Sequence, residues 1–220
     1  MSPPIRSRIE LATWIESCVL GDLRTLLAGV DSYYASTSHL STEGRPLGSA
    51  NFLLLAGCCS ALDYFAFLYK GSGSDEANVK EFIDRFLEPV DSRYCEVGLI
   101  VWRCFRHGTV HRCWPKRILV EGDSSSAVIT GAGNETTDPH LAPSPDFPGE
   151  TFLINGRQLL FDLTLAFDRG FRDWILVESP DGVLERANPE DFLVRTGDRE
   201  GRRQLEAVRR WNHGLRATHS

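Results

Sequence analysis

The chain has 220 residues, of which 42% are hydrophobic and 25% charged, and its formal net charge is −6. These values are typical of a soluble globular protein with one domain, or one domain with appendages, and with room for a full core. The N-terminal segment lacks the apolar stretch of a secretory signal, and the six cysteines form no Cys-x-x-Cys pair. We therefore expect a cytoplasmic protein without structural disulfides.

Apolar periodicity and turn residues predict four helices in the first half of the chain, at 5–30, 51–70, 75–87 and 91–114. In the first of these, Ile9 is one of the residues that form the expected apolar stripe. The third helix should stop before Pro89. In the second half, short strands are expected at 117–121, 127–130 and 152–154, with a turn at 121–126 and a flexible, proline-rich loop with little to bury at 131–149. Further helices are expected at 157–174 and 204–211, with a turn at 180–182.

These elements predict a mainly α fold, an up-and-down helical bundle with a small antiparallel β appendage (α+β). The helical domain would span residues 1–180, with the hairpin and loop inserted at 117–156, and residues 181–220 would form a basic C-terminal extension. Seven arginines against three acidic residues in 194–220 fit a solvated helix, or else an auxiliary nucleic-acid contact.

The segment 52–69 is apolar throughout except for Asp63. Its length approaches that of a membrane span, but its flanks lack a positive bias, and a central core helix explains it better. A carboxylate inside such a helix is costly to bury without a partner. We expect Arg103 or Arg106 to pair with Asp63, either as support for a site or as a structural ion pair.

The segment 101–120 contains five cations, Arg103, Arg106, Arg112, Lys116 and Arg117, together with His107 and His111, and no acid. Such a cationic segment in an acidic protein points to phosphate binding. Zinc ligation by Cys104, His107, His111 and Cys113 is an alternative, but the nearby cations would repel the metal and no second ligand cluster exists. We therefore expect no metal and no cofactor. A Cys104 thiolate nucleophile is a further, weaker alternative.

RNA carries its own nucleophile, the 2′-hydroxyl, so cleavage needs only an acid/base group and stabilisation of the phosphorane. His111 suits the first role and Arg106 the second, while His107 would orient Arg106 or the substrate. Five residues turn an ideal helix through about 500°, which leaves Arg106 and His111 about 140° apart. Gly108 could loosen the helix, or a two-fold dimer could bring two copies of the motif together.

The segment Arg106-His107-Gly108-Thr109-Val110-His111 resembles the signature of the HEPN superfamily, in which an arginine is followed by a polar residue and, after four to six intervening positions, by a histidine. The resemblance implies an all-α, usually dimeric bundle that acts as a metal-independent ribonuclease in toxin–antitoxin or other defence systems. It would make Arg106 and His111 catalytic and place His107 at the polar position. RNA, a second copy of the chain and an antitoxin protein would be the partners, and no membrane would be involved.

Each of these residues also has a structural interpretation. Arg103 and Arg112, assigned to substrate binding with Lys116 and Arg117, fit solvent-facing positions on a half-buried helix, which is the preferred interpretation for these two. Lys116 and Arg117 could complement the dipole at a helix C-terminus. His107 could be a hydrogen-bonded structural residue. The competing function is a non-catalytic HEPN-like module that binds nucleotides or a protein partner.

Overall fold

The computed structural model describes residues 5–39, 51–71, 75–106, 118–120, 123–133, 136–143, 151–188, 203 and 206. Side chains are described for these residues except Asn51 and those of 118–133. Residues 1–187 form one unit and residues 188–220 a second. The boundary therefore lies after Ala187 rather than after residue 180, because helix α8 (Val183–Ala187) packs on α1 and α3.

The fold is mainly α, as the sequence predicts, and its first element is one long helix in three parts: α1 (Arg8–Trp14), η1 (Ile15–Val19) and α2 (Leu20–Thr37). Ser7 caps its start by accepting a hydrogen bond from the backbone N–H of Glu10 at 3.1 Å. The middle part is π-helical, and the buried face is formed by Leu11, Ile15, Leu20 and Val30. Ile9 is 70% exposed, so its place in the predicted apolar stripe was wrong.

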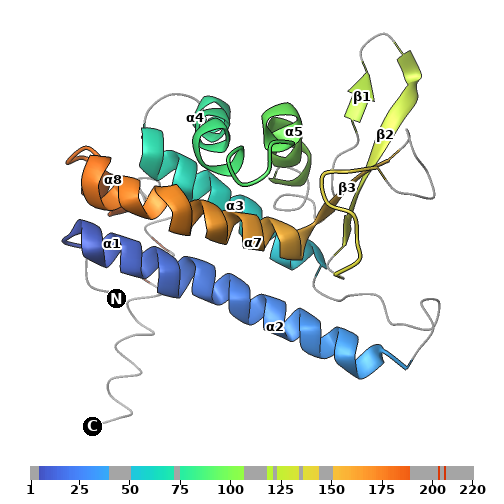
Figure 1. The fold of residues 1–220 in the computed structure, drawn as a ribbon, viewed down its shortest axis with the longest axis horizontal. Coiled ribbons are helices and arrows are strands. Elements are labelled where there is room, and N and C mark those ends of the chain that lie inside the picture. Colours follow the sequence, from blue (N-terminus) through green and yellow to red (C-terminus); the bar gives the residue numbers. More distant parts are fainter. Residues whose placement is uncertain are drawn as a thin grey trace. The chain divides into compact units, whose positions relative to one another are not determined.

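Three further helical segments follow; the first two match the predicted bounds, the third begins at Tyr94, and its predicted end at 114 lies outside the described residues. They are α3 (Asn51–Lys70), then α4 (Asp75–Phe82) with η3 (Ile83–Leu87), then α5 (Tyr94–Val101) with η4 (Trp102–Arg106). In the second half, α7 (Gly156–Ala166) continues into η5 (Phe167–Phe171) and η6 (Trp174–Glu178). Asn155 caps α7 by accepting a hydrogen bond from the backbone N–H of Gln158 at 3.2 Å. Figure 1 shows α7 running beside α2, in the opposite direction.

Aromatic packing around α3 forms the centre of the core. The ring of Phe65 lies 5.3 Å from that of Phe171 and 6.0 Å from that of Phe82, and all three side chains are fully buried. Two glycines allow helices to approach closely, because a Cβ at Gly57 would lie 2.6 Å from Leu23 and one at Gly98 would lie 2.8 Å from Ile83. The axial position of α5, and hence of η4, therefore depends on Gly98.

The β appendage is a sheet of three strands, β1 (Ile118–Val120), β2 (Asp123–Gly133) and β3 (Thr151–Asn155), in the order β1-β2-β3. The β1–β2 pair is antiparallel, as predicted, whereas β2 and β3 are parallel. A parallel pair requires a crossover of a dozen or more residues, and the long separation between Gly133 and Thr151 supplies it. The prediction of a purely antiparallel appendage was therefore wrong for its third strand. The predicted turn is also shorter, since β2 already begins at Asp123.

The segment 136–143 corrects the prediction of a loop with little to bury. His140 and Leu141 are only 8% and 6% exposed, and Ala142 forms a bridge with Leu153 of β3. Leu141 has φ of 50°, an uncommon value for a residue other than glycine. Burial of its side chain in the core and the flanking bridge offset the cost of that backbone conformation. This segment is thus a fixed part of the fold.

Helix α3 is long and apolar enough to cross a membrane over Phe52–Lys70, where its mean hydropathy is 1.7, but half of that segment is buried inside the protein. Its buried residues pack against α2, α4 and α7, as expected of a central core helix. Leu53 is the large apolar residue of α3 that stays exposed. The five described cysteines are free thiols, and Cys58, Cys59 and Cys104 are buried.

Candidate functional site

A carboxylate on α3 joins two side chains of η4. Arg106 donates from Nε to Oδ2 of Asp63 at 2.6 Å, and Trp102 donates from Nε1 to Oδ1 of the same carboxylate. Trp102 and Arg106 are four residues apart on one helical segment, so both face α3, and the Cζ atom of Arg106 lies 5.9 Å from the Trp102 ring centroid. We call Asp63, Trp102 and Arg106 the arginine cluster.

The arginine cluster is partly open to solvent. The side chains of Arg106 and Asp63 are 24% and 23% exposed, and Trp102 is 4% exposed. Below them Cys59 is fully buried, and desolvation, followed by the Asp63 charge, raises the pKa of its thiol well above the usual value. The thiol of Cys59 on the inner side of the cluster is therefore buried and neutral, whereas the guanidinium of Arg106 reaches the surface.

The local helix geometry around Arg106 is π-helical rather than α-helical, over Trp102–Arg106. The predicted angle of about 140° between Arg106 and His111 assumes an ideal α-helix. The turn that ends at Arg106 is not an ideal α-helix. Short π-helical segments in proteins occur frequently at functional sites. The sequence contained no signal for this widening.

Arg103 occupies a different face of the same segment. Its Nε and terminal nitrogen donate to Glu76 of α4 at 3.0 and 2.5 Å, and the two side chains are 55% and 43% exposed. The Glu76 contact raises the pKa of the Arg103 guanidinium further above its usual value. Of the two partners that the sequence allowed for Asp63, the structure thus shows Arg106, while Arg103 forms a surface ion pair.

The other predicted site residues, His107, His111, Arg112, Lys116 and Arg117, lie outside the described residues. The same holds for Cys113, and of the four proposed zinc ligands only Cys104 is described, as a buried side chain. Within the described ranges no group of three or more His, Cys, Asp or Glu side chains could hold a metal ion. Of the predicted site residues, the structure therefore describes Asp63, Arg103 and Arg106.

A second polar cluster, which the sequence analysis missed, lies at the other end of α5. The Tyr94 hydroxyl donates to Oδ2 of Asp162 on α7 at 2.8 Å, and Nε2 of His140 lies 3.2 Å from the same oxygen. Gln158 donates to Oδ1 of Asp162 at 2.8 Å, and the backbone N–H of Asn155 donates to Nδ1 of His140 at 3.1 Å. We call Tyr94, His140 and Asp162 the buried triad.

Hydrogen bonds connect the members of the buried triad. Nδ1 of His140 accepts the backbone N–H of Asn155, and its Nε2 is hydrogen-bonded to the Tyr94 hydroxyl at 3.2 Å. The side chains of His140 and Asp162 are 6% and 3% exposed. Burial, followed by the Asp162 charge, raises the pKa of Tyr94 well above its usual value. With every partner satisfied and almost no exposure, the triad fastens segment 136–143 to α5 and α7 rather than forming an open site.

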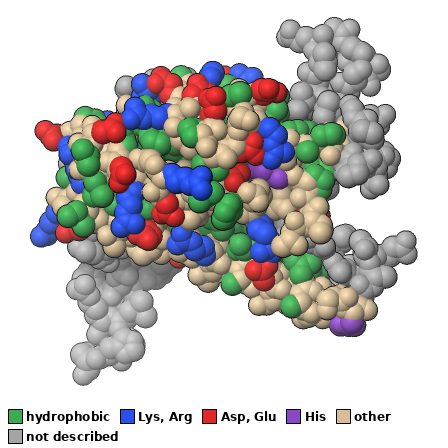
Figure 2. Space-filling view, viewed as in Figure 1, with side chains coloured by type: hydrophobic (Ala, Val, Ile, Leu, Met, Phe, Trp, Pro, Cys, Tyr) green, Lys and Arg blue, Asp and Glu red, His purple; other side chains and the backbone are tan. Residues whose placement is uncertain are grey.

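Surface charge gives little further guidance on the face drawn in Figure 2. Lysine and arginine side chains there are interspersed with aspartate and glutamate rather than gathered into one basic surface. Several of the arginines are engaged in ion pairs, among them Arg172 with Glu16 at 3.2 Å and Arg157 with Asp31. The net charge of −6 agrees with this mixed surface.

Comparison with known proteins does not place the chain in a family. No family model matches it, no curated protein matches it, and no solved structure matches it. The resemblance to the HEPN superfamily therefore depends on residues 106–111 and on the mainly helical architecture.

Proposed function

We propose that this protein is a metal-independent endoribonuclease of HEPN type, in which Arg106 and His111 act on the phosphodiester. The observation that supports this most strongly is the arginine cluster: the arginine of the motif is hydrogen-bonded to the Asp63 carboxylate, lies beside the Trp102 indole and stays 24% exposed. An arginine fixed through Nε presents its guanidinium in one orientation, which favours forked hydrogen bonding to phosphate oxygens.

Asp63 orients the guanidinium of Arg106, but its negative charge lies near the proposed phosphate site. A carboxylate beside a phosphate site repels the substrate, but its charge is shared between Arg106 and the indole N–H of Trp102. The lost side-chain entropy of a long arginine is then paid on folding, before RNA binds. Asp63 and Trp102 are positioning residues in this proposal and do not touch the substrate.

In the proposed reaction His111 accepts the proton of the RNA 2′-hydroxyl, and that oxygen attacks the adjacent phosphorus. Arg106 stabilises the negative charge of the phosphorane, and the 5′ oxygen leaves with a proton from an acid. The products are a 2′,3′-cyclic phosphate and a 5′-hydroxyl end. In a two-fold dimer, the partner subunit's His111 would serve as that acid. His107 would orient the substrate, and Arg112, Lys116 and Arg117 would bind neighbouring phosphates.

The assembly and setting are part of the same proposal. We propose a cytoplasmic homodimer, with an antitoxin-like protein as a further partner in a toxin–antitoxin or defence system. Most apolar residues of α3 serve the core of the chain itself, so the dimer interface must draw on other surfaces. Sedimentation at micromolar concentration should show a dimer, and a strictly monomeric protein would argue against a composite site.

Cleavage of single-stranded RNA in EDTA tests the proposal. Wild-type protein should produce 2′,3′-cyclic phosphate ends, and Arg106→Ala and His111→Ala should each abolish them while leaving the protein folded. His39→Ala and Arg172→Gln are matched controls, because His39 is exposed and Arg172 pairs with Glu16. Equal cleavage by wild type and His111→Ala would exclude the catalytic role. Salt-dependent RNA binding without cleavage would instead favour the non-catalytic binding module.

A further inference from the structure

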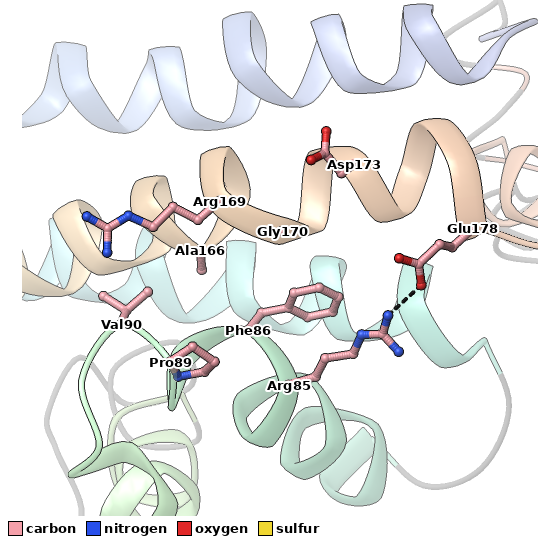
Figure 3. Close-up of a pocket in the computed structure, with 9 residues that line it drawn as sticks. All are labelled: Arg85, Phe86, Pro89, Val90, Ala166, Arg169, Gly170, Asp173 and Glu178. Carbon is pink, nitrogen blue, oxygen red and sulfur yellow. Dashed lines mark hydrogen bonds and ion pairs between the residues drawn. The ribbon is translucent and has the colours of Figure 1, made fainter.

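The helix formed by α7 and η5 has two sides beyond its contact with α3. Contacts within the chain close the first side: Phe86 of η3 is 6% exposed, and a Cβ atom at Gly170 would lie 3.3 Å from its ring. Beside this contact, Arg85 donates to Glu178 at 2.5 Å (Figure 3). Aromatic packing and an ion pair of the chain itself therefore cover this side.

The second side, along α2, leaves apolar side chains open to solvent. A groove of about 430 Å³ lies between α2 and α7, and its apolar residues are Leu27, Leu160 and Phe161. Phe161 is 55% exposed, and Leu27 is only partly buried. An exposed aromatic side chain next to an apolar groove is typical of a surface that contacts another protein.

Ion pairs fix the register of the two helices around this groove. Arg157 of α7 pairs with Asp31 of α2, and their side chains are 26% and 48% exposed. Beyond the other end of the groove, Arg172 pairs with Glu16 of η1 at 3.2 Å. Arg24 donates to the backbone carbonyl of Glu16 at 3.5 Å, so its guanidinium is directed along the helix. At the level of Arg157, the groove therefore has a cation on its α7 side and an anion on its α2 side.

This surface is complementary to a copy of itself. A two-fold axis parallel to α2 and α7 places α7 of one copy over α2 of the other, at the same level along the helices. Phe161 then lies over the partner's Leu27, and Arg157 faces the partner's Asp31. The two arginines and two aspartates alternate in sign around the axis, which is favourable, whereas an acidic or a basic partner would be repelled by half of them.

We propose that this α2–α7 surface, formed by Leu27, Asp31, Arg157 and Phe161, is the interface through which two copies of the chain form a dimer. The proposal rests on the homodimer of the proposed function and assigns to it a surface outside the apolar core of α3. Phe161 provides the apolar centre of the interface, and the charged side chains set the orientation of the two copies. None of these residues belongs to the arginine cluster, so substitutions at this surface leave that cluster intact.

Sedimentation velocity of the full-length protein tests the apolar centre. Wild type should form a dimer at micromolar concentration, and Phe161→Glu should raise the dimer dissociation constant about 10-fold or more, because it buries a carboxylate in the partner's groove. Leu53→Glu is the matched control, since Leu53 is 62% exposed on α3 and does not line the groove. It should leave the dissociation constant unchanged. Both positions are exposed, so both variants should still unfold cooperatively.

Mixing two charge variants tests the orientation. Arg157→Asp brings only acidic side chains together at the axis of its own dimer, and Asp31→Arg brings only cationic ones together. Each variant alone should therefore dissociate about 10-fold or more readily than wild type. In an equimolar mixture each variant faces opposite charges on the other, so the heterodimer should form with nearly wild-type affinity. The intramolecular ion pair is lost in both variants and stays lost in the mixture, so it cannot account for this recovery.

The outcomes separate this proposal from the proposed function. A wild type that stays monomeric would overturn the interface together with the homodimer. A dimer that withstands Phe161→Glu, or a mixture of charge variants that associates no better than its components, would overturn the interface and leave the homodimer standing. RNA cleavage does not enter these measurements, so failure of the catalytic proposal is distinguished from failure of the interface.

Discussion

Two polar clusters lie at opposite ends of the α5–η4 segment, and each is centred on an aspartate from another helix. In the arginine cluster, Asp63 accepts hydrogen bonds from an indole and a guanidinium. At the buried triad, Asp162 accepts them from the Tyr94 phenol and the Gln158 amide, and the His140 imidazole lies 3.2 Å away. Arg106 and Asp63 are about a quarter exposed, whereas His140 and Asp162 are almost fully enclosed. The two clusters thus differ mainly in solvent access: a ligand in solution can reach Arg106 but not the buried triad.

The largest difference between the two clusters is expected in the rate of RNA cleavage. Arg106→Gln should lower RNA cleavage about 100-fold or more, since removal of one preorganised donor to a transition-state oxyanion typically has that effect. Its effect on unfolding should stay near 1 kcal/mol, because Asp63 keeps the Trp102 hydrogen bond and partial hydration. Single-turnover cleavage and urea unfolding of the same preparation separate the two quantities. An equal loss of stability and cleavage would mean that Arg106 is only structural.

The buried triad should show the opposite pattern. Asp162→Ala removes the acceptor of Tyr94 and Gln158 next to the buried His140, which should cost about 3 kcal/mol or more. Urea denaturation measures this loss, and Asp168→Ala is the matched control because Asp168 is exposed on the adjacent segment. A change below about 1 kcal/mol for Asp162→Ala would contradict the fastening role.

A smaller effect should appear at alkaline pH. The pKa of Tyr94 is raised in the folded protein, so the neutral phenol is favoured by folding. Its contribution is complete below the unfolded pKa of about 10 and is lost as the pH rises above that value. Tyr94→Phe should lower stability by about 1 kcal/mol at pH 7, and it should lose less stability than wild type between pH 8 and pH 11. Thermal unfolding at both pH values checks this, and parallel curves for the two proteins would refute it.

The smallest change is expected at Arg103. Its ion pair with Glu76 is roughly half exposed, and such pairs contribute about 0–1 kcal/mol. Arg103→Gln should therefore shift the thermal midpoint by a few degrees at most. If Arg103 binds RNA rather than serving only as a solvent-facing residue, the variant should reduce the salt dependence of RNA binding. An unchanged salt dependence would leave it as a surface residue alone.

The sequence predicted the helices well wherever apolar spacing and turn residues agreed. Helical structure over 75–87 matches α4 and η3 because Val79, Phe82 and Phe86 repeat at helical steps and Pro89 follows. A carboxylate isolated in an apolar helix requires a partner, which made the pairing of Asp63 with Arg106 one of two expected outcomes. The exposure of Ile9 shows that spacing alone does not identify the buried face when a π-helical segment shifts the register.

The buried triad could not be predicted from apolar spacing and turn residues. Tyr94 and Asp162 are 68 residues apart, and His140 lies in a proline-rich segment that suggests a surface loop. No local sequence pattern indicates that these three side chains are in contact. Their contacts depend on the pairing of segment 136–143 with β3, which places His140 next to the helices. The parallel pairing of β2 and β3 was missed for the same reason, since strand direction depends on the path of the connection rather than on the strand residues.

The most direct test of the contrast between the clusters is the rate of RNA cleavage per folded molecule in EDTA, compared between Arg106→Gln and Tyr94→Phe. We expect Arg106→Gln to be slower than wild type by about 100-fold or more, and Tyr94→Phe to retain the wild-type rate once the folded fraction is taken into account. Wild-type cleavage by Arg106→Gln, or an equal loss of rate in both variants, would contradict the assignment of chemistry to the exposed cluster and of structure to the buried one.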